Sequence, residues 1–284
     1  MKRAMATLLG FLVAAGAMAQ VADGDQHWNL RADGSQSGHA KADNVNAAIA
    51  AYQKAIATDP NDLEARWKLL RTLRFKGAYV AASNDEKKQI YAQAKKAGEE
   101  TLTVLDKRLA TKGINSASKA TEQQVADAAK TIPGASEIFL WDAINWGEWA
   151  LAYGKFAAAR EGAADRIRRE ATIANLIDPK LEGGSPSRVL GRLHDQTPRI
   201  PFITGWASSK DAVKFLNDSL KVDPTNKITI VFLAEAMVNN NSDTRPQAVQ
   251  MLKTAVTAPI DTNYVVEQTA ALNDAKNLLR KWGA

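Results

Sequence analysis

The chain has 284 residues, of which 45% are hydrophobic and 24% are charged, and it contains no cysteine. These values are typical of a globular protein, and the length allows an apolar core in one large domain or two small ones. The lack of cysteine excludes disulfide bonds and a lipid-attachment site, so packing alone must stabilise the fold. The net charge of +6 is mild and the cations are interleaved with acids, so we expect no nucleic-acid partner.

The first 19 residues show the features of a signal peptide in the usual order. Lys2 and Arg3 precede a short apolar run, and Ala17 and Ala19 offer a cleavage site of small residues before Gln20. The apolar run is shorter than the about 20 residues that a membrane-spanning helix needs. We therefore expect residues 1–19 to be removed on export and the protein to be soluble, in the periplasm or secreted. The alternative is a buried N-terminal helix.

The remaining chain divides into a short lead-in and one long domain. Residues 20–43 are polar and contain three glycines, so we expect a flexible segment from which Trp28 docks onto the body. Residues 44–284 are rich in alanine and carry apolar residues at helical spacing, which predicts a single all-helical domain.

The start of this domain carries the pattern from which its fold is predicted. Ala48, Tyr52 and Ala55 recur at helical spacing, and Asp59-Pro60 ends this helix because proline cannot continue one. A second helix follows directly. Small side chains let two helices approach closely while the tyrosine fills the gap between them. This order before Asp-Pro is typical of the second helix of a tetratricopeptide repeat.

Similar helix ends return later, but not at a constant period. Two further Asp-Pro pairs place prolines at 179 and 224, so the intervals from Pro60 are 119 and then 45 residues. Neither interval is a multiple of the roughly 34-residue repeat. Further helices are predicted near residues 84–109 and 136–158, separated by a polar linker. We predict an all-α fold, an α–α superhelix of tetratricopeptide-like helical hairpins with insertions.

The helix expected at residues 136–158 contains the first candidate binding site. Trp141, Asn145 and Trp149 lie along one stripe of this helix. One interpretation is a pocket with aromatic walls, in which Asn145 or Glu148 anchors a ligand or partner. The alternative is a core helix whose aromatic side chains supply packing volume.

A second candidate site follows a pair of glycines. Gly183 and Gly184 form a sharp turn, and Ser185 can cap the helix that follows. A helix N-terminus beside Arg188 and Arg192 could hold an anion. The alternative is a turn that only caps the helix.

Signatures of catalysis and of metal binding are absent from the sequence. It has three histidines and no His-Glu-x-x-His pattern, and no Gly-x-Ser-x-Gly elbow occurs. Ser116 and Lys119 match a Ser-x-x-Lys pattern, but they fall in the polar linker without its companion motifs. We therefore expect no enzyme activity, no cofactor and no metal.

Taken in order, these motifs resemble the tetratricopeptide-type T component of tripartite ATP-independent periplasmic (TRAP) transporters. The resemblance covers about residues 45–280. It rests on the order of the helix Ala48–Pro60, the helix Leu63–Tyr79, the helix start Asp85–Lys88, the aromatic helix Trp141–Trp149, the stop Asp178-Pro179, the turn Gly183–Gly191, and the repeat Ala212–Pro224 with Phe232–Glu235 after it.

The resemblance implies a periplasmic protein without enzymatic activity. Members of this family are thought to associate with a substrate-binding component and to form homo-oligomers that enclose an apolar channel. We therefore expect an accessory binding protein whose partner is a periplasmic solute-binding protein and whose ligand is a small hydrophobic organic acid. The alternative is a general protein–protein scaffold of the cell envelope without a small ligand.

Overall fold

The computed structural model describes the backbone of residues 2–284 and the side chains from residue 16 onward. Over residues 2–284 it contains thirteen α-helices and no β-strand, which confirms the predicted all-α fold. The elements are α1 (Lys2–Asn29), α2 (Ala42–Thr58), α3 (Leu63–Tyr79), α4 (Asn84–Ala110), α5 (Glu122–Ala129), α6 (Ala135–Tyr153), α7 (Lys155–Arg160), α8 (Ala163–Ile177), α9 (Leu181–Gln196), α10 (Ser209–Val222), α11 (Lys227–Asn240), α12 (Arg245–Thr257) and α13 (Val265–Trp282), with short 3₁₀ helices at Ser242–Thr244 and Thr262–Tyr264. None of the helices in the described range is long and apolar enough to cross a membrane.

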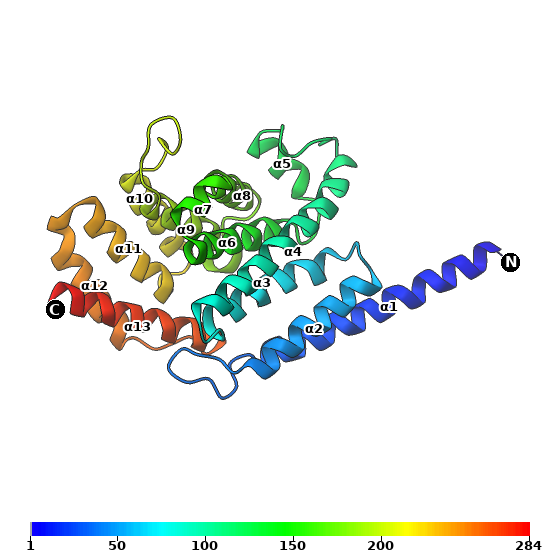
Figure 1. Ribbon diagram of the computed structural model, residues 1–284, viewed down its shortest axis with the longest axis horizontal. Helices are drawn as coiled ribbons and strands as arrows, with labels where there is room; N and C mark the ends of the chain where they lie inside the picture. Colours follow the sequence, from blue (N-terminus) through cyan, green and yellow to red (C-terminus); the bar gives the residue numbers. More distant parts are fainter. Residues whose placement is uncertain (1) are drawn as a thin grey trace.

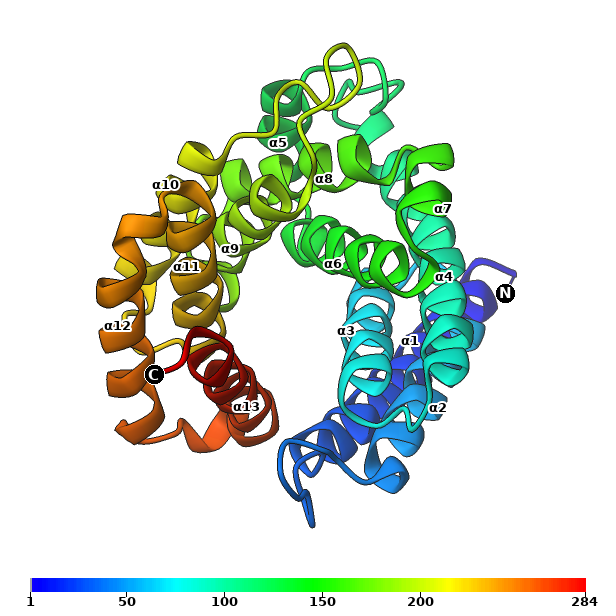
Figure 2. The same ribbon diagram turned by 60° about the vertical axis from the view of Figure 1, so that its left-hand side comes forward.

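Neighbouring helices pack in pairs along a curved path (Figure 1). Figure 2 shows α3, α6, α9, α11 and α13 on the inner side of the curve, with α2, α4, α10 and α12 outside them. The C-terminal helix α13 returns to the turn at residues 30–41, where the Asn273 side chain donates a hydrogen bond to the Ser37 carbonyl at 2.9 Å. The two ends of the path therefore meet, and we call the side toward the centre of the curve the inner face.

The predicted helix ends are confirmed at all three Asp-Pro pairs. Asp59, Asp178 and Asp223 each follow the last residue of a helix and adopt extended backbone angles, since the next residue is a proline. The next helix of the first and third pairs is then capped by a side chain: Asp62 accepts from the Ala65 amide, and Asn226 from the Thr229 amide. Short helical hairpins therefore follow from local sequence.

The hairpin of α2 and α3 packs as its residues predict. Ala48, Tyr52 and Ala55 are fully buried, together with Leu70 and Leu73 of α3. The alanines allow the two helices to approach, and the tyrosine ring fills the space beside them. Residues 45–80 are thus two abutting helices.

The N-terminal segment differs from the expected flexible lead-in. Residues 20–29 are the last part of α1 and pack along α2, with Val21 buried and Trp28 at 5.4 Å from the Phe75 ring. A Cβ atom at Gly24 would lie 2.5 Å from the Tyr52 ring, so this glycine permits close packing and does not mark a loop. The polar composition of residues 20–43 gave no sign of the apolar contacts that Val21 and Trp28 make. Cleavage after Ala19 stays a prediction.

The predicted signal peptide lies largely outside the side chains that the structure describes. The backbone of residues 2–19 is helical within α1, while Met1 and the side chains of residues 1–15 are outside the described part. Further along, the helix expected at residues 136–158 is interrupted at Gly154, whose φ of 90° is left-handed. The chain therefore forms α6 and α7 there, and Phe156 of α7 is exposed.

Candidate functional site

Four arginines from distant parts of the chain come together at the inner face. Arg31 follows α1, Arg71 and Arg74 lie one turn apart on α3, and Arg188 lies on α9. We call these four residues the inner arginine cluster. Three glutamates accompany them, namely Glu148, Glu182 and Glu267. The group therefore has one more arginine than glutamate.

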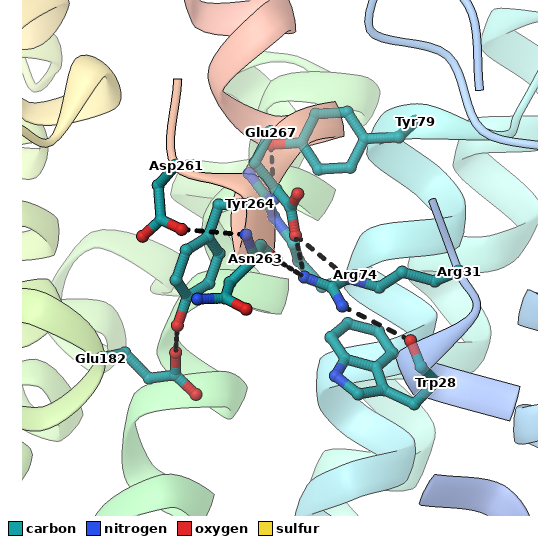
Figure 3. Close-up of polar contacts among 9 residues, drawn as sticks. All are labelled: Trp28, Arg31, Arg74, Tyr79, Glu182, Asp261, Asn263, Tyr264 and Glu267. Atoms are coloured by element: carbon teal, nitrogen blue, oxygen red, sulfur yellow. Dashed lines mark hydrogen bonds and ion pairs between the residues drawn. The ribbon is translucent and has the colours of Figure 1, made fainter. Parts of the chain in front are cut away.

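Arg31 ties the N-terminal part of the chain to the C-terminal part. Its guanidinium forms an ion pair with Glu267 at 3.2 Å, and it also donates to the Asn263 and Trp28 carbonyls (Figure 3). The Trp28 ring lies 4.4 Å from the guanidinium carbon, within the range of a cation–π contact. Because the Arg31 guanidinium is already bonded to these groups, its role is to join the two ends of the chain.

Arg74 is the second arginine with a carboxylate partner. It forms an ion pair with Glu148 of α6 at 3.0 Å. It also donates to the Tyr79 hydroxyl at 2.9 Å (Figure 3). Burial works to lower the pKa of Arg74, but its interactions with the Tyr79 hydroxyl and the Glu148 carboxylate outweigh burial and raise this pKa. Arg74 is therefore a permanent cation of the inner face.

Arg71 lies between two tryptophans and lacks a complete set of partners. Its guanidinium carbon is 4.1 Å from the Trp28 ring and 4.9 Å from the Trp67 ring. Its buried Nε has no hydrogen-bond partner among the described residues. Burial lowers the pKa of Arg71, which is the direction expected when a charged group loses water without full compensation.

Arg188 has no carboxylate within ion-pair distance in the part of the chain that the structure describes. Its protein contacts are the Thr229 hydroxyl at 3.1 Å and the Glu182 carbonyl at 3.4 Å. Burial lowers the pKa of Arg188 to about 10, and the like charge of Arg74 adds to the shift. Two arginines thus repel each other here, and a bound anion would relieve that repulsion.

The Glu182 carboxylate is held by the C-terminal segment. It accepts a hydrogen bond from the Tyr264 hydroxyl at 3.3 Å (Figure 3). Glu182 has a φ of 47°, a left-handed conformation that is costly for a residue other than glycine. The non-helical turn at residues 182–184, near the start of α9, is therefore held in a strained form that joins α9 to the start of α13.

The structure separates the residues of the predicted aromatic site. Asn145 is fully buried, and its amide donates to the Leu70 carbonyl at 3.0 Å and the Trp141 carbonyl at 2.8 Å, so it joins α6 to α3. Trp149 lies in the core, 5.6 Å from Trp146. Glu148 of this group reaches the inner arginine cluster through its ion pair with Arg74. Trp141 is partly exposed, and its indole N–H has no hydrogen-bond partner among the described residues. Asn145 and Trp149 therefore pack the core instead of facing a ligand.

The predicted glycine turn is filled by the protein itself. Gly183 and Gly184 adopt left-handed angles, and Cβ atoms there would lie 3.2 Å from the Asp223 carboxylate and 3.0 Å from the Ser219 carbonyl. A bound anion at this helix start would meet the Asp223 carboxylate. The turn therefore packs against the end of α10, and Arg188 reaches the inner face one turn later.

Arg192 lies one turn beyond Arg188 on α9 and is fully paired. It forms ion pairs with Glu235 of α11 and with Asp195, the latter at 3.2 Å. The sequence motifs include Glu148 and Arg188 of this group, and Arg192 outside it, but not Arg31, Arg71 or Arg74. The Arg-x-x-Arg spacing of Arg71 and Arg74 in an apolar helix is a signal for two of them, whereas Arg31 has none.

The arrangement has the chemistry of a binding site. The planar guanidinium of an arginine can bind a carboxylate, and the aromatic rings can pack against the rest of an organic ligand. No group of residues with metal-ligand character occurs in the described part of the chain. The chain matches no model of a protein family, and no curated protein matches it.

Proposed function

We propose that the protein binds a small organic anion at the inner arginine cluster and works as an exported accessory binding protein. The paired helices support an α–α superhelix of tetratricopeptide-like hairpins, and the ordered motifs support a role like that of a TRAP transporter T component. Its partner is then a periplasmic solute-binding protein. The observation that carries the proposal is Arg188, a cation without a carboxylate partner that faces a second cation, Arg74.

Charge and shape favour a carboxylate as the bound group. An enclosed cation that lacks a counterion costs several kcal/mol, and an anionic ligand offsets that cost. The planar fork of arginine matches a carboxylate with two parallel hydrogen bonds. The rings of Trp28 and Trp67 flank Arg71 and offer apolar surface to the organic part. An aromatic carboxylate such as benzoate fits this description.

A thermal-unfolding titration with benzoate tests the proposal. A ligand that binds only the folded state at about 100 times its Kd adds about 2.7 kcal/mol of stability, so we expect the melting temperature to rise by several degrees. Benzylamine has a similar ring and the opposite charge, and we expect no rise with it. The proposal fails if both compounds, or neither, stabilise the protein.

Two arginines one turn apart on α9 provide matched variants. Arg188→Gln should abolish the response to benzoate, because it removes the cation without a carboxylate partner. Arg192→Gln should keep the response, since Arg192 is already paired with Glu235 and Asp195. Unliganded Arg188→Gln should also be as stable as the natural protein or more so, because the repulsion from Arg74 is relieved. Retention of the benzoate response in Arg188→Gln would contradict the assignment.

The identity of the partner needs a separate experiment. A pull-down from the cell envelope of the source cells should recover a solute-binding protein if the accessory role is right. Recovery of secretion or wall-assembly factors in its place supports the alternative, a general scaffold of the cell envelope. The two experiments fail independently, because one measures a ligand and the other a protein partner.

A further inference from the structure

The loop between α9 and α10 presents apolar side chains to solvent. Residues 198–206 extend away from the helices, as the yellow-green loop in Figures 1 and 2 shows. Phe202 is fully exposed, and Ile200 and Ile203 are also exposed. Three large apolar side chains at one protruding loop are unusual for a surface that contacts only water.

The loop has a defined internal structure. The Thr204 hydroxyl donates to the Pro198 carbonyl and accepts from the Ile200 amide at 3.1 Å, and the Thr204 amide donates to the Ile200 carbonyl at 2.9 Å. Phe202 has a φ of 64°, which is a strained conformation for an aromatic residue. The backbone bonds across the loop thus fix the segment that exposes the Phe202 ring.

The base of the loop is anchored to the body by Trp206. The indole N–H of Trp206 donates to the Asp165 carboxylate of α8 at 2.9 Å, and Arg168 lies 4.7 Å from its ring. The His194 ring packs edge-on against it at 5.2 Å. These contacts hold the base of the loop against α8 and α9, so the fold itself keeps Phe202 exposed.

The charged residues of the loop itself are cations, while the nearby acid Asp165 is paired with Trp206 and Arg168 at the base. Residues 198–210 contain Arg199 and Lys210 and no acidic residue. Apolar and aromatic side chains flanked by cations are the combination that enters the headgroup region of an anionic bilayer. A protruding tip also suits a broad surface, whereas a peptide partner is usually held in a groove.

We propose that residues 198–206 form a peripheral contact with an anionic lipid surface, in which Phe202 enters the interface and Arg199 meets the headgroups. The apolar tip supplies the insertion, and the cations supply selectivity for anionic lipid. This proposal is independent of ligand binding at the inner arginine cluster, since none of its residues belongs to that cluster.

The lack of cysteine gives a local test of the contact. In the full chain, Phe202→Cys can be labelled with an environment-sensitive fluorophore at that position alone. Val222→Cys is the matched control, because Val222 is a partly exposed apolar residue at the far end of α10, about 20 Å along the helix. A label at each position reports on its own surroundings, so binding of another segment to lipid does not confuse the result.

We expect vesicles that contain phosphatidylglycerol to shift the emission of the label at Phe202→Cys to the blue, with no shift at Val222→Cys. Vesicles of phosphatidylcholine alone should give a smaller shift at Phe202→Cys, and salt should reduce the response to anionic vesicles. No shift, an equal shift at both positions, or an equal shift with both kinds of vesicle would overturn the proposal.

An unlabelled pair of variants extends the test to affinity. Phe202→Ser should weaken the binding of the protein to anionic vesicles about tenfold, while Val222→Ser should leave it unchanged. Equal helical circular dichroism of both variants would show that the fold survives. If Phe202→Ser abolishes capture of a protein partner but does not change vesicle binding, the loop docks a protein instead and the proposal is wrong.

Discussion

At the scale of single residues, the clearest energetic feature outside the candidate site is a pair of buried acids. Asp142 of α6 and Glu170 of α8 share one cation, Arg166, at 2.8 Å and 3.0 Å. One oxygen of each carboxyl has no hydrogen-bond partner among the described residues. Burial raises the pKa of both groups, and the negative charge of Asp142 raises the pKa of Glu170 further. One cation cannot balance two buried carboxylates, so both groups hold a proton to higher pH than free carboxyl groups do.

This pair predicts that stability decreases as pH rises. A carboxyl with a raised pKa binds its proton more tightly in the folded state, so its contribution is complete below the unfolded value of about 4 and is lost as pH rises through the folded value. Glu170→Gln supplies a permanent hydrogen. At about pH 8, the unfolding free energy of the Glu170→Gln protein should exceed that of the natural protein by about 1–3 kcal/mol. Near pH 4 the two proteins should be equally stable. Denaturant titrations at both pH values measure the difference.

Glu122 provides the control for this prediction. It forms an ion pair with Arg169 of α8 at 3.1 Å, but its side chain is 40% exposed to solvent. Glu122→Gln should therefore change stability by less than about 1 kcal/mol at any pH. A Glu170→Gln protein that is less stable than the natural protein at neutral pH would show that the pair is fully ionised.

At the scale of elements, the sequence predicts those helix boundaries that depend on local chemistry. The ends at Asp59, Asp178 and Asp223 follow from the proline that comes after each. The break between α6 and α7 was missed, because a glycine inside an apolar helix is often tolerated and only its left-handed angle at Gly154 shows the break. The short helix α5 was missed as well, since it lies beside the polar linker.

The last turns of α1, residues 20–29, were predicted to be flexible, because a glycine there suggested a loop where the chain is helical. From the sequence, Gly24 predicts a loop, whereas in the structure it lies inside a helix against the Tyr52 ring. The Tyr52 hydroxyl donates to Asp25 at 2.8 Å, and Asp25 also pairs with Lys68 at 2.6 Å. These contacts hold residues beyond the predicted cleavage site to α2 and α3, so they would remain after removal of a signal peptide.

Gly24→Ala tests this packing. Alanine favours a helix over glycine by about 1 kcal/mol, so an unconstrained site would gain stability. At Gly24 the added methyl would lie 2.5 Å from the Tyr52 ring, and we expect a net loss of about 1–3 kcal/mol. Gly147→Ala in α6 is the control, since the nearest atom there is 4.0 Å away, and it should gain stability. Parallel thermal melts measure both, and a gain at Gly24 would disprove the close packing.

At the scale of the whole molecule, closure of the curved path creates the candidate site. A Cβ atom at Gly38 would lie 2.8 Å from the Ala270 amide nitrogen, so the N-terminal turn and α13 are in close contact. Arg31 joins the same two regions through Glu267. Arg31 and Glu267 thus bring both ends of the chain into the inner arginine cluster.

This meeting of distant residues explains how much of the site was predictable. Glu148 and Arg188 were identified because each lies in a local motif, an aromatic helix or a glycine turn. The remaining arginines meet them only through the curvature of the stack. Arg31 lies 236 positions before Glu267, and no local pattern predicts that pairing.

The most direct test of the central claim, that the inner arginine cluster binds an organic anion, is a crystal structure with para-bromobenzoate, in which the anomalous signal of bromine locates the ligand. We predict that the carboxylate pairs with Arg188 and that the ring lies toward Trp28 and Trp67. No bromine signal at the inner face, or one only at the outer surface, would contradict the account.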